Sequence, residues 1–152
     1  MTASNTAPDH LQLDRVRRAV LAMPMARTLG LAFRALEGGR AELEMPIADA
    51  FTFRPGHLQA SAVFAAADFA AVSAAGSLLA PGWINSTIDA TLKLLAPARG
   101  QRLIARGRVV HPGGLLTVCA AEVYAEDDGR ETLCATLLGT ARNHDANARA
   151  AS

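Results

Sequence analysis

Aromatic side chains are scarce in this chain: they make up 5% of its 152 residues, although 51% of the residues are hydrophobic. Small and aliphatic side chains, chiefly Ala, Leu and Val, must therefore fill the interior. A chain of this length is expected to form one domain, and it is long enough to bury a sizeable core.

Cysteine is equally scarce, because Cys119 and Cys134 are the only two and each lies in an apolar, strand-like run. Two isolated cysteines make neither a disulfide framework nor a set of metal ligands. We therefore expect both to be small buried side chains in a reducing compartment. His111 and His144 lack the spacing of metal ligands, so the sequence predicts no metal site.

Neither sign of charge is in excess, since 15 basic and 14 acidic residues leave a formal net charge of +1. Such a chain has no strong field to attract nucleic acid or an anionic membrane, and we expect neither as a partner. The sequence also lacks a glycine-rich phosphate loop. It has no Gly-x-Ser-x-Gly motif, which weighs against ester cleavage by an α/β-hydrolase.

The two ends are polar, and we expect disordered tails at residues 1–10 and 145–152 around one domain at residues 11–144. The first ten residues have no basic start followed by an apolar stretch, so they do not resemble a signal peptide. Residues 58–80 are long enough to span a membrane. However, Asp68 lies near their middle, where a charge is unfavourable. These features predict a cytoplasmic protein without a membrane span.

Apolar residues recur at helical spacing over Leu11–Met23, and Pro24 is expected to end that helix. Alternating residues over Leu29–Leu36 and Ala41–Ile47 predict a hairpin. Ala48–His57 is then expected to be a loop.

A long apolar helix is expected from Ala60 to Leu79, where Pro81-Gly82 stops it. Four further strands are expected at Ile84–Leu95, Arg102–His111, Leu115–Glu126 and Glu131–Asn143. The order of these elements predicts an α+β domain, in which a sheet of about six antiparallel strands is covered on one face by the central apolar helix.

Asp68 is the one ionisable side chain between His57 and Asp89, in a segment that is otherwise apolar or small. An ionised carboxylate in a buried helix is costly unless it is hydrogen-bonded, paired or near water. Buried carboxylates with shifted pKa values cluster at functional sites. We therefore expect Asp68 to be catalytic. The alternative is a structural acid at an interface, paired with an Arg or with backbone donors.

Several segments carry a resemblance to a known family. Gln59-Ala60-Ser61 opens the expected helix, and Asp68 follows nine residues after Gln59; residues 86–98 form a long strand, and residues 107–113 and 135–141 belong to later ones. In this order and spacing they resemble the hotdog-fold acyl-CoA thioesterases of the PaaI type, over about residues 25–143. That family's helix opens with His-Gly-Gly, which Gln59-Ala60-Ser61 replace here, and its acid follows nine residues after the His.

Two further departures from the family concern binding. Phe53 stands where the family often has an Asn, six residues before the helix start. Basic residues that hold coenzyme A phosphates in the family are replaced by Gly114-Leu115-Leu116. These departures motivate the alternative function, a non-catalytic acyl-CoA-binding or lipid-binding hotdog domain.

The resemblance implies a thioester hydrolase that acts on a small or medium acyl-CoA. A carboxylate such as Asp68 can attack the thioester directly or deprotonate a water. The N–H groups of Ala60 and Ser61, at the positive end of the helix, are expected to bind the oxyanion. Gln59 is expected to donate to the carbonyl or to orient a water. Gln59 as a cap or solvent-facing residue, and Ser61 as a capping residue, stay open as alternatives.

The resemblance also implies a homodimer or homotetramer with the site at a subunit interface. The acid would come from one chain and the helix start from the other. His57 and Phe53 are candidate substrate-binding residues, although a loop histidine such as His57 is often only solvated. Coenzyme A is expected as part of the substrate, and no separate cofactor is expected.

Overall fold

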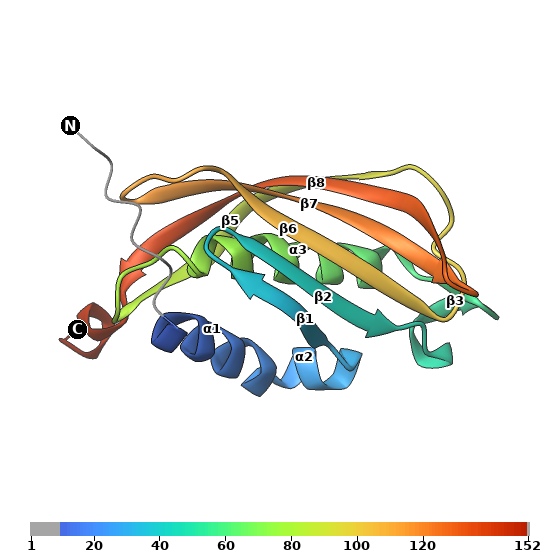
Figure 1. The fold of residues 1–152 in the computed structure, drawn as a ribbon, viewed down its shortest axis with the longest axis horizontal. Helices are drawn as coiled ribbons and strands as arrows, with labels where there is room; N and C mark the ends of the chain where they lie inside the picture. The colour runs from blue at the N-terminus through green and yellow to red at the C-terminus, as the bar shows by residue number, and fades with distance from the viewer. Residues whose placement is uncertain (1–9, 152) are drawn as a thin grey trace.

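The computed structural model of the protein describes residues 10–151. Of the disordered tail expected over residues 1–10, residues 1–9 lie outside this range and stay a prediction, whereas His10 is helical, which corrects the expected boundary. One antiparallel sheet of six strands, in the order β1-β2-β6-β7-β8-β5, curves around the central helix α3 (Figure 1). The helix spans Ala60–Gly76, and the strands are β1 (Ala32–Glu37), β2 (Arg40–Pro46), β5 (Trp83–Leu94), β6 (Arg102–His111), β7 (Leu116–Asp127) and β8 (Arg130–Asp145). This architecture confirms the α+β class and the hotdog fold.

Helix α3 lies in the centre of the core, because alanines let the sheet approach it closely. Ala67, Ala70 and Ala74 are fully buried, and the inward side chains of the sheet, such as Leu43 and Val123, are buried with them. Strand β6 comes close to the helix at Gly107, where an added Cβ would collide with the backbone of Ala70. The small side chains of α3 and the glycine at position 107 therefore set the distance between the helix and the sheet.

The N-terminal segment differs from the sequence expectation. The first helix, α1, spans His10–Ala22, but Pro24 begins a second helix, α2 (Pro24–Leu29), in place of leading to a strand. Proline suits the first position of a helix because its missing N–H has no partner there. Gly30 ends α2 with a φ of 71°, so β1 starts at Ala32 and the strand expected from Leu29 was wrong over its first three residues.

Residues 48–58 contain more structure than the loop expected there. A short 3-10 helix (Asp49–Phe51) leads into the small hairpin of β3 (Thr52–Arg54) and β4 (His57–Leu58). Backbone bonds tie this hairpin to the start of α3 and to the β5–β6 connection: the Gln59 N–H donates to the Phe51 carbonyl (2.8 Å), and the Leu58 N–H donates to the Ala98 carbonyl (2.9 Å).

The remaining boundaries differ by a few residues. Helix α3 ends at Gly76, three residues before the expected end. Asp128 and Gly129 adopt φ values of 47° and 79° between β7 and β8, as the Asp-Gly signal predicted. At the other end β8 runs to Asp145, and a short 3-10 helix (Ala146–Ala151) occupies the segment expected to be a tail. No helix in residues 10–151 is long and apolar enough to cross a bilayer.

Both cysteines are free and buried, which confirms the expected packing role. Burial raises the pKa of the Cys119 and Cys134 thiols to about 11. Neither side chain is therefore a reactive thiolate at neutral pH.

Candidate active site

Asp68 lies in the middle of α3 and is half-buried. The hydroxyl of Thr87 on β5 donates a hydrogen bond to its Oδ1 atom, over 2.7 Å. Burial raises the pKa of the Asp68 carboxyl above its ordinary value of 3.8, and the Thr87 hydrogen bond opposes that shift. Asp68 forms no ion pair with an Arg among the described residues of its own chain, and the alternative of a structural acid at a subunit interface stays open.

A β-bulge directs Thr87 toward the helix. Ala90 and Leu92 pack on the core, so strict alternation would turn Ile88 inward as well. The register of β5 against β8 shifts between Thr87 and Asp89, and Ile88 is 56% exposed as a result. Such a bulge re-aims the side chains that precede it. Thr87 is therefore a candidate site residue that sequence reasoning missed, since alternation in the sequence pointed away from it.

The start of α3 presents the other predicted groups. Gln59 is the N-cap residue of α3, with extended backbone angles (φ −64°, ψ 141°). Its side chain makes no capping hydrogen bond to this helix within the residues that the structure describes. Its carbonyl accepts from the N–H groups of Ala62 (3.0 Å) and Val63 (3.2 Å). The N–H groups of Ala60 and Ser61 precede these bonds, at the positive end of the helix. Ser61 is the second helical residue, so the alternative that it caps the helix was wrong. Gln59 occupies the N-cap position without a capping hydrogen bond, and its side chain is exposed, so the alternative of a solvent-facing Gln59 agrees with the structure of one chain.

The two halves of the predicted site lie apart within one chain. Asp68 follows Ala60 by eight residues on the same helix. At a rise of about 1.5 Å per residue, that is about 12 Å along the axis. The structure of one chain therefore does not bring Asp68 to Gln59, Ala60 or Ser61, and their catalytic roles stay predictions.

His57 and Phe53 lie together on the β3–β4 hairpin before the helix start. Their rings are 6.0 Å apart between centroids, edge to face. The Nδ1 atom of His57 lies 3.0 Å from the Pro55 carbonyl oxygen, and the Arg54 guanidinium lies 5.5 Å from the centre of the Phe53 ring. Phe53 is 61% exposed and His57 is half-buried, so this hairpin offers an aromatic surface beside Gln59.

A groove of about 540 Å³ opens beside Asp68 and Thr87, between α1, α3 and the first half of β5. Most of its lining is apolar and includes Val16, Val72 and Trp83. The carboxyl with the raised pKa and the apolar groove therefore occupy the same place, as is typical of a site for an organic substrate.

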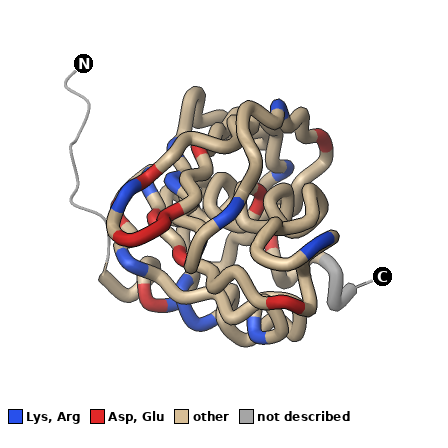
Figure 2. The backbone as a smooth tube through the Cα atoms, turned by 90° about the vertical axis from the view of Figure 1, so that its right-hand side faces the viewer, with Lys and Arg blue, Asp and Glu red and all other residues tan. Residues whose placement is uncertain are grey.

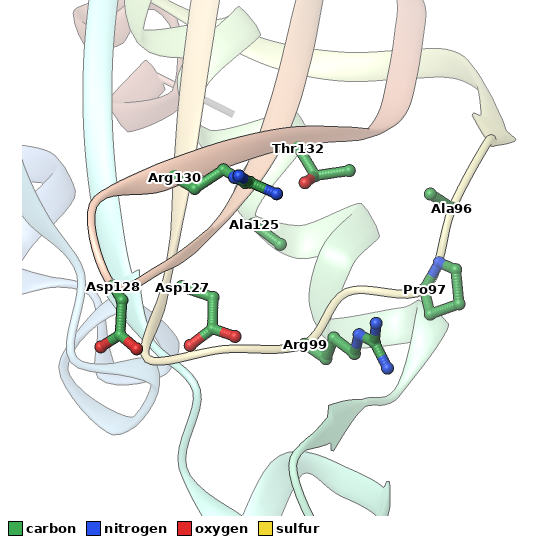
Figure 3. A pocket seen from close by; sticks show the side chains of 8 residues that line it. All are labelled: Ala96, Pro97, Arg99, Ala125, Asp127, Asp128, Arg130 and Thr132. Carbon is green, nitrogen blue, oxygen red and sulfur yellow. The ribbon is translucent and has the colours of Figure 1, made fainter.

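A second cavity, of about 680 Å³, lies between the β5–β6 connection and the β7–β8 hairpin. Figure 3 shows Arg99 and Arg130 in its wall together with Asp127 and Asp128. None of the predicted site residues lines it. Its two arginines and two aspartates balance in charge, so the cavity has no excess of either sign. The same mixture holds over the rest of the chain, where Figure 2 shows basic and acidic positions interspersed along the backbone. We therefore take the groove beside Asp68 as the candidate active site.

Comparison with known proteins identifies the family. The model of the thioesterase superfamily matches residues 55–132, which is half of the chain and includes both Asp68 and Thr87. A search of curated proteins finds no match. Among solved structures, a thioesterase family protein from Silicibacter pomeroyi is 36% identical, with a TM-score of 0.84 over 87% of this chain and 97% of that one.

Two more distant structures share the fold. The thioesterase HI1161 of Haemophilus influenzae is 18% identical, with a TM-score of 0.80 over 92% of this chain and 95% of that one. The PaaI protein of the E. coli phenylacetic acid degradation operon is 20% identical, with a TM-score of 0.78 over 88% of this chain and 94% of that one. The family assignment rests on two findings. The family model matches half of the chain, and the Silicibacter protein is 36% identical to it. This chain belongs to the thioesterase superfamily and is a thioester hydrolase.

Proposed function

We propose that the protein hydrolyses a small or medium acyl-CoA thioester, with Asp68 as its nucleophile or general base. The observation that carries this proposal is the hydrogen bond from Thr87 to Asp68 at the edge of an apolar groove. The bond fixes one carboxylate oxygen and leaves the other for chemistry. Membership of the thioesterase superfamily argues against the alternative of a non-catalytic acyl-CoA-binding domain.

Two routes are open to the carboxylate. In the first, a carboxylate oxygen attacks the thioester carbonyl carbon, the C–S bond breaks, and coenzyme A leaves as a thiolate that takes up a proton; water then hydrolyses the anhydride. In the second, Asp68 takes a proton from a water that attacks the carbonyl, and returns that proton to the leaving thiolate. Both routes need donors for the oxygen that becomes negatively charged.

We propose that a second copy of the chain supplies those donors through Ala60 and Ser61. In one chain these N–H groups lie about 12 Å along the helix from Asp68. Strand β5 stands at the edge of the described sheet, and Ile88 and Leu94 on it are 56% and 55% exposed. An exposed apolar edge strand is a ready site for pairing with another chain. Antiparallel pairing of two β5 strands would bring each helix start toward the partner's carboxyl.

The proposed assembly is therefore a homodimer, or a homotetramer made of two such dimers. Gln59 would orient the carbonyl or a water, and Phe53 and His57 would contact the substrate at the helix start. Coenzyme A enters as part of the substrate, with no separate cofactor. We also propose a cytoplasmic location, which fits two cysteines that are free and buried.

The test compares the purified protein with its Asp68→Asn variant on a panel of aliphatic and aromatic acyl-CoAs, followed by release of free thiol. Asparagine keeps the shape of the side chain and an oxygen that accepts from Thr87, so the fold should persist. We expect the variant to lose a factor of about 10²–10⁴ in kcat. Full activity in a folded Asp68→Asn variant would contradict the proposed role of this carboxyl.

A further inference from the structure

Two polar side chains lie buried in the wall of the groove beside Asp68. Gln12 on α1 is 5% exposed and Ser73 on α3 is 2% exposed. The Gln12 amide donates from Nε2 to the Gly76 carbonyl over 3.3 Å. Its Oε1 atom and the Ser73 Oγ atom have no hydrogen-bond partner among the described residues.

These two oxygens need an explanation, because buried polar groups in proteins are nearly always hydrogen-bonded. Here two unpaired atoms belong to the same wall, which is otherwise mostly apolar. Helix geometry also places the two side chains on the same side of α3. The Gly76 carbonyl accepts the hydrogen bond from the Gln12 amide, and Gly76 follows Ser73 by three residues. Residues at that spacing are neighbours on one helix face.

We propose that Gln12 and Ser73 recognise a hydroxyl group at the far end of the acyl chain; this rests on the proposed acyl-CoA hydrolysis at Asp68. The bond to Gly76 fixes the amide so that Oε1 is left as a pure acceptor. The Ser73 hydroxyl both donates and accepts. A hydroxyl on the ligand can therefore donate to Gln12 while it accepts from Ser73. A methyl end leaves both groups unpaired, and a carboxylate has no proton for Gln12.

The spacing along α3 sets the length of the acyl chain. Ser73 follows Asp68 by five residues and Gly76 follows it by eight, which places the polar pair about 8–12 Å along the helix from Asp68. That distance corresponds to a medium acyl chain, whose methylene groups would pack on Val16 and Val72 in the groove wall. Each of the two oxygens has less than 1 Å² of exposed surface, so a ligand hydroxyl reaches them only when side chains of the groove wall rearrange.

The experiment measures kcat/KM for two series of substrates, unsubstituted acyl-CoAs from hexanoyl to decanoyl and the same chains with a terminal hydroxyl. We expect the hydroxylated chain to be preferred by about ten-fold at the best length, as one or two neutral hydrogen bonds allow. Ser73→Ala and Gln12→Leu should each abolish the preference, so that the ratio of kcat/KM between the hydroxylated and the unsubstituted chain of one length falls to about one. Having two variants keeps the test informative if one of them fails to fold.

Ser77→Ala is the matched control. Ser77 is also a buried serine near the end of α3, but its hydroxyl donates to the Ala74 carbonyl (2.6 Å) and accepts from the Gly39 N–H (2.7 Å). It does not line the groove. This variant should lose stability and keep the preference for the hydroxylated chain.

Equal rates for the two series, or a preference that survives both Ser73→Ala and Gln12→Leu, would overturn the inference and leave the proposed function standing. Failure to hydrolyse any thioester would overturn the proposed function instead. Calorimetric binding of both series to the Asp68→Asn variant then tests the pair separately. Tighter binding of the hydroxylated chain supports the site, and equal or absent binding overturns it.

Discussion

The Oγ1 atom of Thr87 lies 2.7 Å from the Oδ1 atom of Asp68 and joins the edge strand β5 to the middle of the central helix. The bond stabilises the ionised carboxyl, against a burial that raises its pKa. The hydrogen bond that opposes the effect of burial on the pKa of Asp68 therefore comes from the strand that we propose as the subunit interface.

Thr87→Val removes this hydrogen bond and keeps the shape of the side chain. Because the bond lowers the pKa of Asp68, its loss should raise that pKa further. The acid limb of the pH profile of kcat/KM should therefore move to higher pH, with the largest loss of activity at the acid end of the profile. Thr136→Val on β8, a threonine with no part in the candidate site, serves as the control. An unchanged acid limb in Thr87→Val would show that Thr87 does not act on this carboxyl.

The ionised carboxyl of Asp68 should lower the free energy of unfolding at neutral pH. Its pKa in the folded protein lies above the ordinary value of 3.8, so the folded state binds a proton more tightly than the unfolded chain does. The free energy of unfolding therefore falls as the pH rises through this range. Asp68→Asn should melt a few degrees above the wild type at pH 7, and the difference should shrink as the pH falls toward 3.8.

Thermal unfolding followed by circular dichroism at a series of pH values measures this difference. Asp14→Asn is the matched control, since Asp14 is exposed and lies 3.8 Å from Arg17 at the surface. A melting temperature of Asp68→Asn that is lower than that of the wild type at pH 7 would mean that the charge stabilises the fold, contrary to this reasoning.

Ala60→Pro deletes one proposed oxyanion donor without breaking the helix. Proline is tolerated at the first helical position, and Gln59 before it already has the extended angles that a residue preceding proline prefers. We expect kcat to fall by about 10²–10³. Ser61→Ala, which keeps its N–H, should stay near the wild-type rate. Wild-type turnover by a folded Ala60→Pro variant would remove Ala60 from the site.

Mixing two inactive variants tests the shared site. If Asp68 of one chain works with the helix start of the other, a mixed dimer of Asp68→Asn and Ala60→Pro chains keeps one intact site of its two. Half of the dimers are mixed after random exchange, so about a quarter of the wild-type activity should return. Thiol release after unfolding and refolding the mixture gives the measurement. If the activity is no higher than the sum of the separate variants, then both groups act within one chain, or one of them is not needed for hydrolysis.

Gly107→Ala should destabilise the core strongly. The added Cβ would collide with the backbone of Ala70 in α3, where no flexible side chain can give way. We expect a loss of about 3 kcal/mol or more in the free energy of unfolding, measured with urea. Gly114→Ala is the control, because nothing lies within 4 Å of a Cβ there. Equal stability of the two variants would mean that helix and sheet separate easily.

Some elements could be predicted because their signals are local. The strand Arg102–His111 was predicted with its observed bounds, and the Asp128-Gly129 turn follows from residues that adopt positive φ readily. Helix α2 was missed because Pro24 is compatible both with the end of one helix and with the start of the next. The outcome depends on how the following residues pack, which periodicity does not report.

Within the candidate site, the acid could be identified without a structure. Asp68 stands out because no other ionisable residue shares its segment, and its spacing from Gln59 follows from counting residues along one helix. The surroundings of Asp68 depend on the three-dimensional fold. Thr87 reaches Asp68 because a bulge reverses the alternation of β5. Gln12 and Ser73 line one groove because α1 packs on α3. Contacts between segments far apart in the chain depend on the packing of whole elements, which local sequence patterns do not determine.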